Sequence, residues 1–314
     1  MSVVLGIDTS NYTTSAAVYD LETGEVRNVG RLLSVKSGEN GLRQSDAVFQ
    51  HTKALPSILA EALEGYEGKI AAVGVSATPR DVEGSYMPCF LAGVSVASSI
   101  ASAIGCSLYK FSHQRGHIMA ALYSQNSFDF AKDKFYAFHV SGGTTELLLV
   151  TPDNDRIINC ELVANTLDLN AGQIVDRVGV MLGLDFPAGI SLDKLAVSGV
   201  LPKKVKINLK DGNCCLSGVE NQCNEMLKSG ASHNDIARYA VEHILETVKL
   251  MTLTAFSKYG EFPVVYAGGV MSNSIISAEI PNTINCIFAK PQFSRDNAAG
   301  IAVLTAIKEG HILI

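Results

Sequence analysis

The sequence predicts an α/β fold of two related lobes, in which mixed sheets are covered by helices. Three observations predict it: the chain has 314 residues, a strand–turn–strand pattern occurs twice, and strand and helix patterns alternate in both halves. A chain of this length exceeds the usual size of one domain, so two domains of about 150 residues each are expected. The apolar fraction of 47% and the charged fraction of 18% exclude a disordered chain.

The repeated pattern opens the chain. An apolar strand over residues 3–7 leads into a polar turn, and a second apolar strand covers residues 15–19. The same pattern returns in the second half, with strands over residues 135–140 and 147–150. The two turns share three residues at the same spacing, namely Ser10 with Ser141, Thr13 with Thr144 and Thr14 with Thr145. Because both copies have the same strand context, the match indicates a duplicated unit.

Helix and strand patterns alternate between and after the two copies. The first half has helical patterns over residues 46–64 and 90–104, with an apolar strand over residues 70–76 between them. The second half continues with helical patterns over 174–182 and 234–259, a strand over 263–266 and a last helix after Asp296.

The expected boundary between the lobes precedes the second copy of the repeat. We expect an N-terminal lobe over residues 1–110 and a C-terminal lobe over residues 111–314, and we expect the final helix to pack back on the N-terminal lobe.

Composition predicts a cytoplasmic protein without a membrane partner. The longest weakly polar run, residues 90–106, is interrupted by serines and is shorter than the ~20 residues that a membrane span needs. The N-terminus has no basic start followed by an apolar stretch, so no secretory signal is predicted. Seven cysteines without a C-x-x-C pair suit neither a disulfide framework nor a zinc ribbon. Free thiols in a reducing compartment are therefore expected.

The net charge of −6 argues against a surface that is basic everywhere. One basic cluster stands out, formed by Lys203, Lys204, Lys206 and Lys210. It is either an exposed hairpin that its lysines keep soluble or a contact for RNA.

Ser141, Gly142 and Gly143 follow a predicted strand and form the first candidate site. Two glycines let the backbone approach an anion closely and direct successive N–H groups toward it, as in phosphate-binding nests. The alternative is an ordinary hairpin turn in which glycine supplies a positive φ.

The segment from His113 to His117 places two imidazoles at positions i and i+4, which lie on one face of a helix and can bind one metal ion. The alternative is two unrelated histidines. Two further side chains can complete the coordination sphere, namely His139, just before the glycine turn, and Asp296, at the start of the last helix. Asp296 is alternatively an N-cap. Three imidazoles and a carboxylate suit zinc or iron.

Further candidates lie at turns between strands and helices. The run Tyr266-Ala267-Gly268-Gly269-Val270 follows an apolar strand and leads to Asn273, so a flat base can lie against its backbone. Carboxylates at the helix starts near residues 168–176 and 187–193 suit ribose hydroxyls or helix caps. The main metal and nucleotide candidates thus fall in the C-terminal lobe, and we expect a nucleotide phosphate, with a metal, in the cleft between the lobes.

Taken together, these segments resemble the TsaD/Gcp (YgjD) family of tRNA N6-threonylcarbamoyladenosine transferases, once called O-sialoglycoprotein endopeptidases. That family belongs to the actin-like ATPase (ASKHA, ribonuclease H-like) superfamily. The resemblance spans nearly the whole chain. The segments that carry it are Gly6-Ile7-Asp8-Thr9-Ser10, His113 through His117, Val140-Ser141-Gly142-Gly143, Asp168 through Asp176, Leu182-Gly183-Leu184 with Pro187, Leu216-Ser217-Gly218, Ala267-Gly268-Gly269-Val270, Asn273, and Asp296-Asn297-Ala298-Ala299.

The resemblance implies a site and a reaction. The implied metal ligands are His113, His117, His139 and Asp296. The implied nucleotide-binding residues are His139, Val140, Ser141, Gly142, Gly143, Asp176, Gly189, Asp193, Gly268, Gly269 and Asn273. The implied cofactors are one divalent metal ion, iron or zinc, and ATP or an acyl-adenylate. The implied reaction passes a threonylcarbamoyl group from its adenylate to N6 of the tRNA adenosine beside the anticodon. Implied partners are tRNA, reached through a partner subunit, and a second copy or a TsaD/TsaB-like protein.

The chain departs from the family pattern beside the reacting centre. Tyr12 and Thr13 stand where the family has an acidic pair, and Arg115 stands where a glutamate is usual in the histidine motif. Other departures are Thr78-Pro79-Arg80 for a Gly-Pro-Gly turn, Gln173 for glutamate, Ala188 for glycine and Arg295 for threonine. We therefore expect a divergent paralogue that keeps the nucleotide and metal sites. The alternatives are a catalytically weak partner subunit and a small-molecule carbamoyltransferase or kinase.

Overall fold

The structure is a computed structural model that describes residues 2–10, 12–35, 42–294 and 298–314. Its contacts divide the chain into two compact units. Unit 1 consists of residues 1–133, 151–159 and 292–314, and unit 2 consists of residues 134–150 and 160–291.

The elements of the first half are β1 (Ser2–Asp8), β2 (Thr13–Asp20), β3 (Val26–Leu32), α1 (Gln44–Ala62), β4 (Lys69–Thr78), α2 (Phe90–Ile104), β5 (Ser107–Ser112), α3 (His113–Ser124), β6 (Phe135–Val140) and β7 (Thr145–Asp153). Those of the second half are β8 (Ile157–Asn165), α4 (Ala171–Met181), α5 (Gly189–Val197), α6 (Ser217–Lys228), α7 (His233–Tyr259), β9 (Val264–Ala267), α8 (Ser274–Glu279), β10 (Cys286–Phe288) and α9 (Ala299–Lys308). Short 3-10 helices include η2 (Gly269–Ser272).

The two sheets have the same topology, which confirms that the two lobes are related. Sheet order is β3-β2-β1-β4-β5 in one and β10-β9-β6-β7-β8 in the other. Each sheet is an antiparallel meander of three strands whose first strand also pairs in parallel with a later one. The strand registers also agree, because Asp8 pairs with Ser15 and His139 pairs with Glu146. Asp8 and His139 therefore occupy equivalent positions in the two copies.

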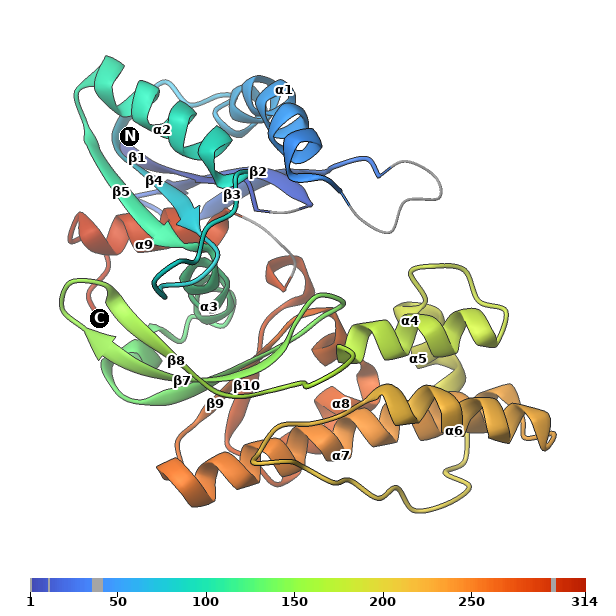
Figure 1. Ribbon diagram of the computed structural model, residues 1–314. Coiled ribbons are helices and arrows are strands. Elements are labelled where there is room, and N and C mark those ends of the chain that lie inside the picture. Colours follow the sequence, from blue (N-terminus) through green and yellow to red (C-terminus); the bar gives the residue numbers. More distant parts are fainter. Residues whose placement is uncertain (1, 11, 36–41, 295–297) are drawn as a thin grey trace. The chain divides into compact units, whose positions relative to one another are not determined.

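Unit 1 has helices on both faces of its sheet. Figure 1 shows α1 and α2 on one face and α9 on the other, and the contacts of these helices with β1, β2 and β4 agree. Strands β1 and β2 are buried over nearly their whole length because both faces are covered. The core between the sheet and α1 and α2 is built from aliphatic side chains such as Leu5, Val73 and Leu55.

Helices α3 and α9 approach closely because both have a glycine at their contact. A Cβ atom on Gly300 would lie 1.8 Å from the carbonyl oxygen of Gly116, and one on Gly116 would lie 2.9 Å from Ile301 Cδ1. This contact explains the unusual glycine in the middle of the histidine motif. It also keeps residues 111–133 in unit 1, so the division of the structure differs from the expected boundary at residue 110. The final helix packs on the sheet of unit 1, in the N-terminal part of the chain.

Unit 2 is built around the long helix α7. Its core joins α7 to the β6 and β9 strands through Tyr136, Phe138 and Tyr266. The Tyr136 hydroxyl donates to the carbonyl oxygens of Ala255 and Gly260 at 3.2 and 2.8 Å, which fixes the end of α7 against the sheet.

The cysteines of the chain are free, as expected. Burial raises the pKa of Cys214 to about 11 and that of Cys223 to about 12, so these thiols stay protonated near neutral pH. Within the described residues, the helices are all too short or too polar to cross a membrane.

Candidate nucleotide and metal sites

All eleven predicted nucleotide-binding residues belong to unit 2. The turn from Ser141 to Thr144 joins β6 to β7 and is closed by a hydrogen bond of 2.7 Å from Ser141 N to Thr144 O. Gly143 N donates to Ser141 Oγ at 3.3 Å. Gly142 and Gly143 are exposed, so the backbone of this turn is accessible.

The two glycines of this turn are not required by its conformation. Neither Gly142 nor Gly143 has a φ in the left-handed region. A Cβ atom on either would meet no other atom within 4 Å. The alternative interpretation, in which the glycines supply a positive φ, is therefore wrong. What the missing side chains provide is an unobstructed backbone next to open space, which is the arrangement that lets an anion come close.

Helix α4 begins directly against this turn. Gly172 N donates to Ser141 O at 3.1 Å, and Ala171 N donates to Thr145 Oγ1 at 2.9 Å. A Cβ atom on Gly172 would lie 2.5 Å from Gly142 N, so only glycine permits this approach. The positive end of the α4 dipole thus lies beside the glycine turn, where it favours a bound anion.

Gly268 and Gly269 lie on the other side of β6 and have different roles. Gly268 has a φ of +100°, and a Cβ atom there would lie 2.2 Å from Val140 O. Gly268 is therefore needed for packing, as the alternative of a packing turn predicts. Gly269 is exposed with nothing within 4 Å of its Cβ position. His139 is half-buried on β6 and pairs with Ala267 of β9.

Helix α5 meets α8 at Asp193. There Asp193 contacts Ser274, which lies eighty-one residues later in the chain and directly follows Asn273. Asp193 accepts hydrogen bonds from Ser274 N and, at 2.9 Å, from Ser274 Oγ. The side-chain oxygen of Asn273 caps α8 by accepting from Ile275 N and Ile276 N, both at 3.1 Å. The side-chain amide nitrogen of Asn273 is a donor that a ligand can use.

The other carboxylates act mainly within the fold. Asp176 accepts from Ala188 N at 2.9 Å, immediately before Gly189 begins α5. Asp168 accepts from Leu216 N at 2.7 Å and from Ser217 Oγ at 2.6 Å. Burial alone would raise the pKa of Asp168, but the hydrogen bonds from Ser217 and from backbone amides outweigh it and lower the pKa. Asp168 does not cap the helix that follows it, because Asn170 caps α4; it binds the first backbone amides of α6 instead.

Two of the four predicted metal ligands are described in unit 1. The His113 and His117 rings lie on one face of α3 with their centroids 4.2 Å apart, as the i, i+4 spacing predicts. Asp296 lies outside the described residues, and His139 belongs to unit 2. In the part of the chain that the structure describes, no three His, Cys, Asp or Glu side chains form a metal-binding group.

Asp8 is a functional candidate that the sequence analysis missed. Its Oδ2 lies 2.7 Å from His113 Nδ1, and its side chain is 1% exposed. Burial alone would raise the pKa of Asp8, but the charge of His113 and hydrogen bonds from His113 and Ser10 lower it overall. A carboxylate that binds Nδ1 orients the ring so that Nε2 can bind a metal. His113 and His117 thus fit two ligands of one metal ion, with Asp8 orienting the first. The sequence feature that could have identified Asp8 is the repeat, which aligns Asp8 with the predicted ligand His139.

A buried histidine, His51 of α1, lies near Asp8 and was also missed. His51 Nδ1 is 2.8 Å from Thr14 Oγ1. Burial lowers the pKa of His51 to about 4, against the opposing charge of Asp8. His51 Nε2 and Ser10 Oγ are buried without a hydrogen-bond partner among the described residues.

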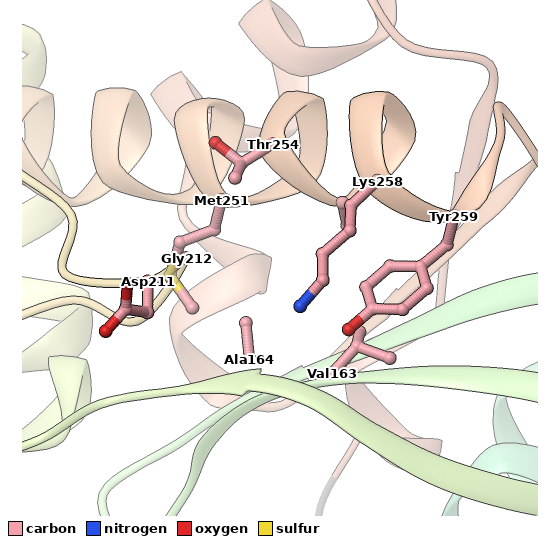
Figure 2. Close-up of a pocket in the computed structure, with 9 residues that line it drawn as sticks. Val163, Ala164, Asp211, Gly212, Met251, Thr254, Lys258 and Tyr259 are labelled. Atoms are coloured by element: carbon pink, nitrogen blue, oxygen red, sulfur yellow. The ribbon is translucent and has the colours of Figure 1, made fainter.

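A pocket in unit 2 lies outside this set of residues. Its volume is about 310 Å³, and its lining includes none of the nucleotide candidates. Figure 2 shows Lys258 and Tyr259 of α7 on one side, Asp211 on the other and Met251 between them. Val163 of β8 closes the pocket from the strand side.

The fold defines the class of the protein. Solved structures with the same fold include component A of (R)-2-hydroxyglutaryl-CoA dehydratase from Acidaminococcus fermentans, with a TM-score of 0.57 and 16% identity over 99% of this chain and 100% of that chain. HypF from T. kodakarensis has a TM-score of 0.57 and 14% identity over 99% of this chain and 48% of that chain. ROK hexokinase from Thermus thermophilus has a TM-score of 0.52 and 14% identity over 98% of this chain and 100% of that chain. The chain thus has the actin-like ATPase fold.

The particular family follows from sequence similarity. Residues 35–303 match the family TsaD, described as tRNA N6-adenosine threonylcarbamoyltransferase. The tRNA N6-adenosine threonylcarbamoyltransferase of Sulfurihydrogenibium sp. (strain YO3AOP1) is 30% identical over 312 residues, which cover 96% of this chain and 88% of that protein. The chain belongs to the TsaD family of tRNA-modifying transferases.

Proposed function

We propose that this chain transfers a threonylcarbamoyl group from its adenylate to N6 of the tRNA adenosine beside the anticodon. The bare backbone of Gly142 and Gly143 at the start of α4 carries the proposal. Within the described residues the Gly142 N–H donates no hydrogen bond, so this donor is available to a ligand or to water. It suits a phosphate or the carbonyl oxygen of the acyl group.

The reaction is an acyl transfer. The adenosine N6 amine forms a bond to the carbonyl carbon, the bond from that carbon to the phosphate oxygen breaks, AMP leaves, and the amine loses one proton to solvent. A backbone N–H group that donates to no acceptor within the protein can donate to the developing negative charge, which lowers the barrier for such a step.

The residues proposed to bind the nucleoside lie around the contact of α5 with α8 in unit 2. Gly269 is exposed and Asn273 is half-buried. The Asn273 side-chain amide can donate to a base, and Asp193 and Asp176 keep unused lone pairs for ribose hydroxyls. These contacts also hold α5 and α8, so substitutions here change both binding and fold.

His113 and His117 are the described residues of unit 1 that would hold the metal, together with Asp296. A bound iron or zinc ion would supply Lewis-acid stabilisation of negative charge. Asp8 orients His113 through Nδ1, and the contact of Gly116 with α9 fixes the helix that carries both imidazoles.

A second function, that of a catalytically weak partner subunit, is favoured by one observation. The family's acidic pair is replaced here by Tyr12, which is 36% exposed, and Thr13, which is buried. Neither side chain can act as a carboxylate base near neutral pH.

The test is single-turnover transfer from threonylcarbamoyl-adenylate to unmodified tRNA, with the modified nucleoside measured by mass spectrometry. We expect the wild type and Gly218→Val to form product, and Gly143→Val to lose most of it, because the valine side chain at residue 143 would occupy the space that a phosphate needs. Gly218 is a matched control because a Cβ atom there meets its nearest atom only at 3.9 Å. ATP binding without any product, even with a TsaB-like partner added, would favour the partner-subunit function.

A further inference from the structure

A stretch of unit 2 carries an unusual concentration of positive charge. Residues 194–210 contain five lysines and no aspartate or glutamate, in a chain whose net charge is −6. Four of these lysines fall within residues 203–210. We call residues 203–210 the basic segment. It lies between α5 and α6 and contains no helix or strand.

The basic segment alternates between the core and solvent. Val205 and Leu209 pack against the core of unit 2, whereas Lys204, Lys206 and Lys210 are exposed. In an extended chain alternate side chains lie on the same side, at intervals of about 6.6 Å. The three lysines therefore form a row that faces away from the core.

The basic segment is held in place at its end. Lys210 N donates to Asn213 O at 2.8 Å, and Asn213 N donates back to Lys210 O at 2.9 Å. Asn213 Oδ1 accepts from Asn165 N at 2.9 Å, which fastens this turn to β8. A binding surface whose backbone is already fixed loses less conformational entropy when a ligand binds.

The exposed lysines of the row are not neutralised. Lys204, Lys206 and Lys210 make no ion pair with any described residue. In contrast, Lys228 lies 2.8 Å from Glu225 and Lys249 lies 3.1 Å from Glu246.

Neighbouring side chains set the extent of the positively charged surface around the row. Lys203 differs from the other three because its Nζ lies over the Tyr239 ring, 5.0 Å from the centroid. Asp211 follows the row in a turn with positive φ and leads into the pocket of Figure 2, so the positive surface ends there. Asp235 is already an acceptor for Val200 N at 2.8 Å.

We propose that the row formed by Lys204, Lys206 and Lys210 binds the sugar–phosphate backbone of tRNA. The proposal rests on the proposed function, which makes tRNA the polyanion that this chain meets. Unpaired lysines two and four residues apart on one side of a segment that is held at its end can each meet a phosphate of one polyanion, and such contacts position an RNA without reading its sequence. In a chain whose net charge is −6, a local cluster of positive charge of this kind favours direct binding of tRNA.

The test compares two triple variants with the same change in net charge. One is Lys204→Gln/Lys206→Gln/Lys210→Gln. The matched control is Lys53→Gln/Lys69→Gln/Lys110→Gln, three exposed lysines of unit 1. Binding of unmodified tRNA to the full chain is measured between about 50 and 200 mM salt, and ATP affinity is measured in parallel to show that unit 2 is folded.

We expect the first variant to bind tRNA about tenfold more weakly than the wild type. The slope of log K against the logarithm of the salt concentration should become less steep by about 2, since each phosphate contact contributes about 0.7 to 0.9 to that slope. The control should stay within about twofold of the wild type, and both variants should bind ATP normally. Equal losses in the two variants would overturn the proposal, as would a wild type that binds no tRNA. If tRNA binding falls as expected but the wild type transfers no acyl group, the proposed function fails while the surface assignment stands.

Discussion

At the scale of single residues, the glycines of unit 2 fall into two kinds. Gly172 and Gly268 are needed because a Cβ atom would collide with backbone at 2.5 and 2.2 Å. Gly142 and Gly143 are not, because nothing lies within 4 Å of their Cβ positions. The sequence alone does not distinguish these two kinds of glycine. The distinction matters for function, because residues that the fold does not need are those left for a ligand.

We predict that Gly143→Ala leaves the free energy of unfolding within about 0.5 kcal/mol of the wild type and weakens ATP binding. Gly172→Ala should instead destabilise the protein by about 1–3 kcal/mol, because the added methyl group displaces α4 from the turn. Denaturant unfolding and isothermal titration separate the two effects. A Gly143→Ala protein that binds ATP as the wild type does would contradict the assignment of the phosphate to this turn.

His51 gives a pH-dependent prediction. Its pKa is lowered from 6.5 to about 4 in the folded state because the ring is buried. The unfolded chain therefore binds a proton more readily than the folded protein. The stability that neutral His51 contributes is complete above pH 6.5 and is lost as the pH falls toward 4, by at most about 3 kcal/mol.

We expect His51→Gln to flatten the pH dependence of unfolding over this range, measured by urea denaturation at several pH values. Exposed His233 provides the matched control, His233→Gln, which should keep the wild-type pH dependence. His243 is also buried with a lowered pKa, so some dependence remains in both variants. Identical curves for His51→Gln and the wild type would show that His51 is not the titrating group.

At the scale of elements, α3 is fixed by residues that depart from the family pattern. Arg115 Nε lies 2.7 Å from Asp81 Oδ2, with side chains only 8% and 14% exposed. Ser112, the N-cap of α3, donates to the same carboxylate at 2.8 Å. Arg115 Nη1 also donates to Arg156 O at 2.8 Å. The arginine in the histidine motif thus has a partner in the loop after Pro79, which also departs from the family.

We predict that Asp81→Asn destabilises the protein by about 3 kcal/mol, because it leaves the Arg115 guanidinium buried without its counter-charge. The double variant Arg115→Met/Asp81→Leu should recover most of that loss. An exposed pair serves as control: Arg31 and Glu61 lie 2.8 Å apart with side chains 51% exposed, and Glu61→Gln should cost less than about 1 kcal/mol. If the double variant is as unstable as Asp81→Asn, the charge pairing is not the cause.

At the scale of the whole molecule, the nucleotide candidates and the two described metal candidates belong to different units. ATP binding to unit 2 should therefore slow hydrogen exchange in peptides over residues 135–150 and 171–181. At ATP concentrations of about 100 times Kd, the slowing should correspond to at most about 2.7 kcal/mol. Peptides from α1 serve as the internal control. Protection confined to unit 1 would contradict the assignment.

The sequence determined the parts of this protein that depend on local patterns. Helix α2 has its predicted bounds, residues 90–104, and α7 begins one residue before the predicted helix over residues 234–259, because amphipathic spacing and caps act over a few residues. The duplicated unit was also predictable, since the shared turn residues fix the strand register around Asp8 and His139. The family follows from the ordered set of motifs.

Only the tertiary structure decided which residues meet across the chain. The contacts of Asp8 with His113, of Asp81 with Arg115 and of Asp193 with Ser274 join residues far apart in sequence. Such contacts depend on how helices pack on sheets, which here depends on close approaches at Gly116, Gly172 and Gly300. A sequence pattern reports the period of one element, whereas a site is formed by the distances between several elements, and those distances are set by packing.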